Sequence, residues 1–190
     1  MILGLLLIVG GAVAASQLLP YVHDRFANWL TPFSQNVYDA QGGSFQLVQG
    51  LFGLAHGGLI GTGLGQGQPW ITPAPQSDYI IASLGEELGL AGLFALFALY
   101  LVFVARGLRI GFAGQDDFGK LLAVGLSFTV ALQCFIVIGG VTRVIPLTGL
   151  TTPFLAAGGS SLVANWIIVA LLLAAVRHRP QSTLAGGELT

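Results

Sequence analysis

The stretch "PAPQSDYIIASLGEELGLAGLFALFALYLVFVAR", residues 73–106, carries three acids at the start of a long apolar run: Asp78, Glu86 and Glu87. An ionised carboxylate inside the hydrocarbon of a bilayer costs at least about 2.5–3.5 kcal/mol. Counted back from Arg106, about 20 residues of helix cross the roughly 30 Å hydrocarbon core, so the far boundary falls near Glu86. Asp78 then lies about 12 Å farther out. The acids are therefore expected at the rim of a membrane helix and not in its middle.

The composition of the whole chain supports this membrane assignment. Of 190 residues, 54% are hydrophobic and only 8% are charged, whereas soluble domains carry roughly 25% charged residues. The net charge is −1, which suggests neither a nucleic acid nor an acidic partner. The single cysteine, Cys134, excludes a disulfide within the chain.

Four segments are long and apolar enough to cross a bilayer, which predicts an all-α integral membrane protein with one membrane domain, residues 1–190. The predicted spans are Ile2–Leu19, Tyr79–Ala105, Leu121–Val141 and Ala156–Val176. The first span has an alternative interpretation as a signal peptide, because "GAVAAS" offers a cleavage site. No Lys or Arg precedes it, so a retained span is expected.

The distribution of Lys and Arg predicts the orientation of these spans. Five of these residues lie on one side of the predicted membrane and two on the other; the five are Arg106, Arg109, Lys120, Arg177 and Arg179, and the two are Arg25 and Arg143. The loop 106–120 and the C-terminus are thus expected in the cytoplasm, and the segments 20–77 and 142–155 outside. The tail 180–190 has the composition of a disordered segment.

The outer segment 20–77 combines a predicted helix with a glycine-rich loop. "FQLVQGLFGLAHGGL", beginning at Phe45, has helix-like apolar spacing and indicates a helix along the membrane face. "GGLIGTGLGQGQP" follows, and its glycines allow a close backbone approach to a ligand, so Gly63, Gly65 and Gln66 are candidate substrate contacts. A nucleotide-binding loop is not expected, because no strand precedes these glycines.

Each polar candidate has a structural alternative. Asp78 follows Ser77 at the predicted helix start, where a carboxylate is also a good helix cap. A second set of hydroxyls flanks Pro153 and a glycine pair, which indicates a re-entrant turn whose helix start either binds an anion or is simply capped. These hydroxyls belong to Thr151, Thr152, Ser160 and Ser161.

Four further polar residues are expected to be structural. Glu86 and Glu87 are interpreted as interfacial anchors or as partners of Arg143. The amides Gln133 and Asn165 lie within predicted spans and are expected to make interhelical hydrogen bonds.

Four stretches together make the sequence resemble the SEDS family of shape, elongation, division and sporulation proteins, the FtsW/RodA group. They are "GGSFQLVQGLFGLAHGGLIGTGLGQG" (42–67), "SDYIIASLGEELGLAG" (77–92), "PLTGLTTPF" (146–154) and "GGSSL" (158–162). The resemblance implies a ten-helix membrane fold, of which this chain provides the last four helices and lacks the N-terminal half.

The resemblance also implies a function. SEDS proteins polymerise lipid II into glycan strands at the outer face of the bacterial plasma membrane during elongation or division, together with a class B penicillin-binding protein. The family's essential carboxylate opens the eighth helix in a "TDF" motif, which matches Asp78 in "SDY". Asp78 would act as a general base or as a ligand of a divalent cation, Mg²⁺ or Mn²⁺. Some members carry a Lys where Thr148 stands, and we hypothesise that nearby Arg143 contacts the substrate diphosphate instead.

Two other functions stay open at this point. A transporter for the lipid-linked precursor would place broken helices or ionisable residues near the midplane between internal repeats, whereas here the charges cluster at the membrane faces. A catalytically inactive fragment that only binds its partner is the third interpretation.

Overall fold

The computed structural model describes residues 4, 10, 11, 19–38, 44–68, 71, 76–114 and 116–177. Apart from residues 4, 10, 11 and 19, the predicted first span Ile2–Leu19 lies outside this described part, as does the predicted tail 180–190. The secondary structure of the described residues is helical throughout, without a strand.

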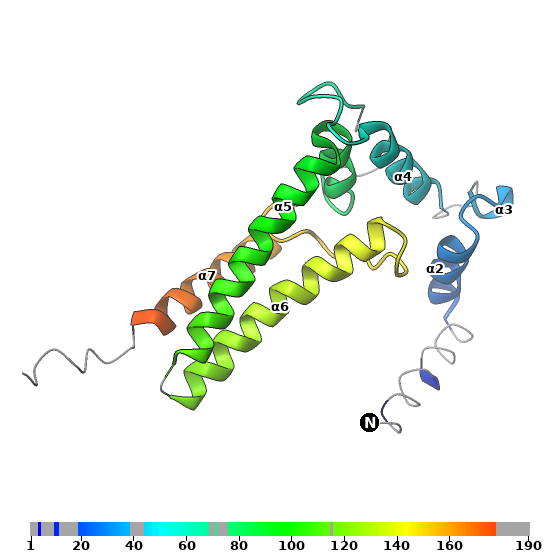
Figure 1. The fold of residues 1–190 in the computed structure, drawn as a ribbon. Coiled ribbons are helices and arrows are strands. Elements are labelled where there is room, and N and C mark those ends of the chain that lie inside the picture. The colour runs from blue at the N-terminus through cyan, green and yellow to red at the C-terminus, as the bar shows by residue number, and fades with distance from the viewer. Residues whose placement is uncertain are drawn as a thin grey trace, which may run out of the picture.

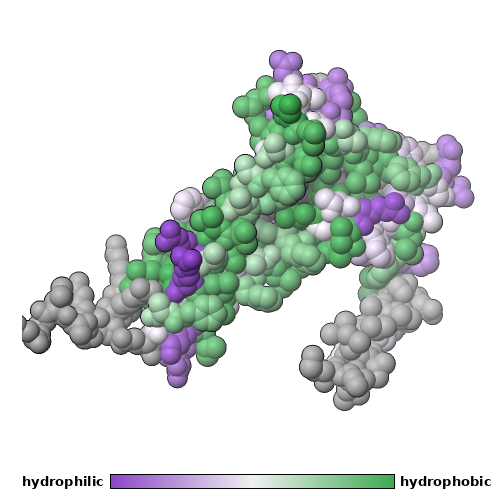
Figure 2. All heavy atoms as spheres, viewed as in Figure 1, coloured by the Kyte–Doolittle hydropathy of each residue, from purple (hydrophilic) through white to green (hydrophobic). Residues whose placement is uncertain are grey.

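Three of the four predicted spans are observed as helices long and apolar enough to cross a membrane. They are α5 (Ile80–Phe112), α6 (Asp117–Val141) and α7 (Gly159–Arg177). The first two form an antiparallel pair, and α7 packs beside them (Figure 1). Hydrophobic residues cover the visible length of this bundle, and hydrophilic residues gather at its two ends (Figure 2). Helix α5 continues past the predicted end at Ala105, because the apolar run resumes after each arginine of "RGLRIGF".

The segment predicted to lie outside contains three short helices that gather at one end of the bundle (Figure 1). They are α2 (Pro20–Leu30), α3 (Gln35–Tyr38) and α4 (Phe45–Gly57). Helix α2 begins with a proline, whose fixed φ and missing N–H suit the first helical position. The helix predicted from the apolar spacing after Phe45 is confirmed as α4. We call this end of the bundle, where α5 begins and α6 finishes, the Asp78 end.

Helix α5 is interrupted at Gly89, which has φ 68° and ψ −172°. The glycine-rich loop after α4 supplies the backbone partners that the interruption removes. Four backbone hydrogen bonds of 2.9–3.0 Å join the two segments: Leu90 N–H to Gly58 O, Ala91 N–H to Leu59 O, Thr62 N–H to Glu86 O, and Gly63 N–H to Glu87 O. A short helix therefore precedes the membrane-length part of α5, and Asp78 lies before this short helix.

The connection between α6 and α7 is re-entrant, as predicted. The side chain of Gln133 in α6 donates to the carbonyl of Thr151 at 2.9 Å, and the Tyr100 hydroxyl of α5 donates to the carbonyl of Pro153. Tyr100 lies about 15 Å along the helix from Leu90. The connection thus returns deep between the helices before α7 begins at Gly159.

Candidate functional site

Asp78 lies in the turn immediately before α5, half-buried at the Asp78 end. The N-cap residue of α5 is Tyr79, and no side chain makes a capping hydrogen bond there. Asp78 makes no hydrogen bond or ion pair with another described residue. The alternative role of Asp78 as a helix cap is therefore not supported, and its carboxylate remains available for chemistry.

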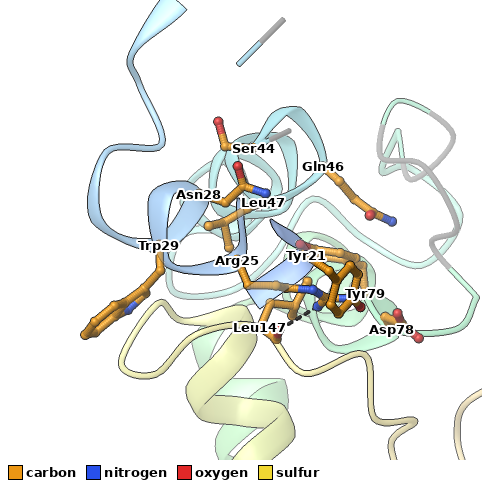
Figure 3. A pocket seen from close by; sticks show the side chains of 10 residues that line it. All are labelled: Tyr21, Arg25, Asn28, Trp29, Ser44, Gln46, Leu47, Asp78, Tyr79 and Leu147. Atoms are coloured by element: carbon orange, nitrogen blue, oxygen red, sulfur yellow. Dashed lines mark hydrogen bonds between the residues drawn. The ribbon is translucent and has the colours of Figure 1, made fainter. Parts of the chain in front are cut away.

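A cavity of about 240 Å³ opens beside this carboxylate (Figure 3). Four segments far apart in the sequence form its walls: α2, the start of α4, the turn before α5, and the connection after α6. The side chains around it include those of Tyr21, Arg25, Gln46, Asp78, Tyr79 and Leu147. Helix α2 thus closes over the beginning of α5, and a cation and an anion line the same space.

Arg25 lies near Asp78 without forming an ion pair with it, and both side chains approach Gly149. A methyl group built on Gly149 would lie 3.5 Å from Oδ2 of Asp78 and 3.9 Å from Nη2 of Arg25. The guanidinium is instead held by neutral groups. Its Nη1 donates to the carbonyl of Leu147 at 2.5 Å, its Nη2 donates to the hydroxyl of Tyr21, and its Cζ lies 4.8 Å from the centre of the Tyr21 ring.

Tyr79 forms the floor of this region and is fully buried. Its ring packs so closely over Gly50 of α4 that a Cβ there would lie 2.7 Å from the ring. Its hydroxyl has no hydrogen-bond partner among the described residues. Burial raises the pKa of Tyr79 well above its usual range, and the charge of Asp78 raises it further, whereas Arg25 opposes the shift. Tyr79 therefore stays protonated at neutral pH.

Arg143, the residue expected to contact a diphosphate, lies against the end of α2 and not in the cavity wall. Its Nε donates to the carbonyl of Trp29 at 2.8 Å and its Nη2 to that of Leu30 at 3.0 Å. The indole of Trp29 donates back to the carbonyl of Arg143 at 3.0 Å. These contacts tie the connection after α6 to α2.

The hydroxyls predicted as an anion site are brought together in part. The Thr151 hydroxyl donates to Oγ of Ser161 at 2.9 Å, and Asn165 donates to the carbonyl of Ser161 at 2.8 Å. Thr152 is buried with no partner for its hydroxyl among the described residues, and Ser160 is exposed. None of these four hydroxyl residues lines the cavity beside Asp78.

The candidate residues of the glycine-rich loop lie against α5. Gly63 is bonded to Glu87 of α5, while Gly65 and Gln66 are exposed at the loop tip. Glu86, expected to be structural, is 6% exposed, and its Oε1 accepts hydrogen bonds from Nδ1 of His56 and the N–H of Gln68, each at 3.1 Å. The carboxylate thus anchors the loop to α5.

Sequence reasoning missed Arg25 and Tyr79 as members of the site. Arg25 is the only Lys or Arg in segment 20–77, and it shares a helix face with Tyr21 and Trp29 through i, i+4 spacing. That spacing indicates a shared helix face, but from the sequence Arg25 is used only as a charge that helps to orient the chain.

The family model for FtsW, RodA and SpoVE, described as "Cell cycle protein", matches residues 1–181. The chain belongs to the FtsW/RodA/SpoVE family. This confirms the resemblance drawn from the four motifs, and together with the three span-length helices it identifies a multi-pass membrane protein.

Several curated members of the family are similar to most of this chain. Peptidoglycan glycosyltransferase RodA of Mycobacterium tuberculosis (strain ATCC 25618 / H37Rv) is 53% identical over 171 residues, which cover 90% of this chain and 36% of the relative. Stage V sporulation protein E of Bacillus subtilis (strain 168) is 41% identical over 161 residues, covering 84% and 43%. The chain therefore spans about two fifths of the length of these relatives.

A solved structure supports the fold. The structure described as "Structural coordination of polymerization and crosslinking by a peptidoglycan synthase complex" contains a chain that matches this one with a TM-score of 0.74 and 27% sequence identity. The match covers 95% of this chain and 48% of the solved chain. The helices described above are thus arranged as in about half of that solved chain.

Proposed function

We propose that the complete protein to which this chain belongs is a peptidoglycan glycosyltransferase that polymerises lipid II into glycan strands, with Asp78 as its general base. One observation carries the proposal: a half-buried carboxylate without a described protein partner lines a cavity that also contains a guanidinium. The names of the relatives, peptidoglycan glycosyltransferase among them, support the same reaction.

The reaction needs one proton acceptor and one group that stabilises the leaving diphosphate. The hydroxyl of the acceptor sugar attacks the anomeric carbon of the donor sugar and forms the new C–O bond. The bond from that carbon to the lipid diphosphate breaks, and the diphosphate leaves with the electron pair. Asp78 accepts the hydroxyl proton as the attack proceeds, which is the role of a general base.

We also propose the orientation and location that this chemistry requires. The Asp78 end faces the outside of the bacterial plasma membrane, where lipid-linked precursors are polymerised. Arg106, Arg109 and Lys120 lie at the opposite end of α5 and at the start of α6, which is the pattern of a cytoplasmic loop. A class B penicillin-binding protein is the proposed partner. The similarity to a chain from a peptidoglycan synthase complex supports this assignment.

The alternative role of Asp78, as a ligand of a divalent cation, requires suitable donor atoms around it. Mg²⁺ and Mn²⁺ sites are built from oxygen ligands, often one or two carboxylates with substrate phosphates. Among the described residues, no group of three or more His, Cys, Asp or Glu side chains is close enough to hold a metal, and the described cavity wall contains a guanidinium beside Asp78. This donor set does not fit a metal cage made by the protein, so no step is derived through a metal.

The transporter alternative draws no support from the interruption of α5. Transporters interrupt helices near the midplane of the membrane. Gly89 lies near the Asp78 end, and the neighbouring glycine-rich loop satisfies the backbone groups around it. The alternative of an inactive fragment is separated from the proposal by assaying this chain alone and with the missing N-terminal half restored.

The decisive experiment is polymerisation of labelled lipid II by the complete protein with its partner, comparing wild type and Asp78→Asn. Loss of the proton acceptor should lower turnover by roughly 10²–10⁴-fold at unchanged membrane abundance. Asp117→Asn, at the exposed start of α6 at the other end of the bundle, is the matched control and should leave polymerisation intact. Normal polymer from Asp78→Asn contradicts the proposal. Activity of the wild type that is lost in chelator and restored by Mg²⁺ or Mn²⁺ replaces the base with a metal ligand.

A further inference from the structure

We propose that Arg25 binds the diphosphate of the lipid-linked donor and that Arg143 positions the helix that presents Arg25. This inference rests on the proposed function, because it assigns the second of the two groups that the reaction needs. It differs from the expectation drawn from sequence, which gave the diphosphate to Arg143.

Two opposite charges face one cavity without neutralising each other. Among the described residues, the ion pairs are His56 with Glu86 and Lys120 with Asp117, and neither contains Arg25 or Asp78. Arginine and aspartate with a purely structural role at this site would gain most by pairing directly, since bidentate hydrogen bonds between them are strong. Here they stay unpaired, and both approach Gly149, which has no side chain to fill the space beside them. The arrangement leaves room for a substrate between a base and a cation.

The partners of Arg25 orient its guanidinium but leave its charge uncompensated. The carbonyl of Leu147 and the hydroxyl of Tyr21 are both neutral, and they accept hydrogen bonds from two of the five N–H groups that a guanidinium carries. The remaining N–H groups form a planar donor set suited to two phosphate oxygens. A restrained cation of this kind loses little conformational entropy when an anion binds.

The reaction needs one group to stabilise the leaving diphosphate and another to accept the hydroxyl proton. When the anomeric C–O bond breaks, negative charge develops on the diphosphate oxygen, and preorganised donors at that oxygen lower the barrier. Asp78 cannot serve there, because a carboxylate repels the diphosphate. Arg25 and Asp78 line the same cavity and are not paired with each other, so the donor diphosphate can contact the guanidinium while the acceptor hydroxyl contacts the carboxylate.

Arg143 contacts the end of α2 and not the cavity. Its guanidinium donates to the carbonyls of Trp29 and Leu30. Both residues belong to the last turn of α2, where carbonyls have no N–H partner within the helix. A cation is also favoured at a helix C-terminus. Trp29 lies one turn after Arg25 and returns a hydrogen bond to Arg143. Arg143 therefore fixes α2 over the cavity and acts on the substrate only through Arg25.

The experiment measures binding without turnover, in the complete protein with its partner and with Asp78→Asn in the background. Polyprenyl diphosphate is the probe, and polyprenyl monophosphate and inorganic pyrophosphate are compared with it. Arg25→Gln should weaken binding of the diphosphate probe by roughly 10- to 100-fold, since hydrogen bonds to charged groups are the ones removed. Arg25→Lys should restore part of the affinity, because it keeps the charge and loses the planar donor set.

Arg143→Gln is compared with Arg25→Gln, because it removes the same guanidinium from the residue that positions α2. It should weaken diphosphate binding less than Arg25→Gln does, because Arg25 is still present, and it should increase hydrogen exchange in α2. A second measurement needs no variant: phenylglyoxal modification mapped by mass spectrometry should be blocked by polyprenyl diphosphate at Arg25 and not at Arg143.

The outcomes separate this inference from the proposed function. Normal polymer from Asp78→Asn contradicts the general base and leaves the binding result on Arg25 standing. Unchanged diphosphate affinity in Arg25→Gln, or protection of Arg143 in place of Arg25, overturns the assignment of Arg25 whatever the polymerisation assay gives. Equal loss of affinity for monophosphate and diphosphate would also overturn it, because the planar donor set would then confer no preference for the diphosphate.

Discussion

Tyr79 and Tyr100 bury their hydroxyls in different ways. Tyr100 donates to the carbonyl of Pro153, whereas the hydroxyl of Tyr79 has no partner among the described residues. A buried polar group without a hydrogen bond destabilises the folded state by about 1–3 kcal/mol. The ring of Tyr79 does the structural work, because it fills the space over Gly50 and packs with Ala82 and Val141.

Replacing each tyrosine by phenylalanine should therefore change stability in opposite directions. Tyr79→Phe removes an unsatisfied hydroxyl and should stabilise the protein by about 1 kcal/mol, whereas Tyr100→Phe removes a hydrogen bond and should destabilise it by about 1 kcal/mol. Thermal unfolding of the complete protein in detergent measures both changes. A destabilised Tyr79→Phe variant would show that the hydroxyl has a partner and that its burial is not a cost.

The residues of the site were predictable to the extent that one motif carries them. Asp78 follows from "SDY" and the family resemblance, which needs only local sequence. The i, i+4 spacing of Arg25 with Tyr21 places it on a helix face, but its membership of the site also depends on Leu147, 122 residues later, and on Gly149. The assignment of the diphosphate to Arg143 rested on its nearness in sequence to Thr148. The contacts with Trp29 and Leu30 that occupy its guanidinium join residues more than 110 positions apart.

At the scale of elements, the predicted spans agree with the helices because apolar length is a local property. The interruption at Gly89 is not local. Gly89 has a positive φ, and residues on both sides of it hydrogen-bond to the glycine-rich loop, which lies about 25 to 30 residues earlier in the chain. Only the folded loop reveals why a glycine is required there.

The contact between α4 and α5 gives a direct test of this element. A Cβ on Gly57 would lie 2.1 Å from the carbonyl oxygen of Gly85 and 2.7 Å from Cα of Glu86, and both neighbours are backbone atoms that cannot move aside. Gly57→Ala should therefore separate α4 from α5 and destabilise the protein by about 1–3 kcal/mol or more.

Gly125→Ala in α6 is the control for this substitution, because nothing lies within 4 Å of the added methyl group. It should leave stability unchanged or raise it by about 0.5–1 kcal/mol, since alanine favours a helix over glycine. Denaturation curves of both variants in the same detergent decide the matter. Equal stability of the two variants would mean that the close approach of Gly57 to α5 is not needed.

At the scale of the whole molecule, many large hydrophobic side chains of the bundle are exposed. Phe94, Leu99 and Leu101 of α5 are 64%, 69% and 69% exposed. Such large exposed hydrophobic side chains suit lipid or further helices of the family fold, of which this chain matches 48% in the solved relative. Hydropathy predicts that these helices cross a membrane. The choice between lipid and protein for each face depends on helices outside this chain, so no pattern within it makes that choice.

The direction in which the bundle crosses the membrane decides whether Asp78 can act on an outer-face substrate. Leu64 lies in the glycine-rich loop at the Asp78 end and is 75% exposed, and the side chain of Asp117 at the opposite end is 94% exposed. In intact cells, a membrane-impermeant maleimide should label Leu64→Cys, and it should label Asp117→Cys only after permeabilisation. Native Cys134 is buried within α6 and should stay unlabelled in both, which controls for unfolding. Labelling of Asp117→Cys in intact cells, with Leu64→Cys protected, would place Asp78 in the cytoplasm. A base on that side could not meet a precursor presented outside, so the general-base role and the diphosphate role of Arg25 would both have to be withdrawn.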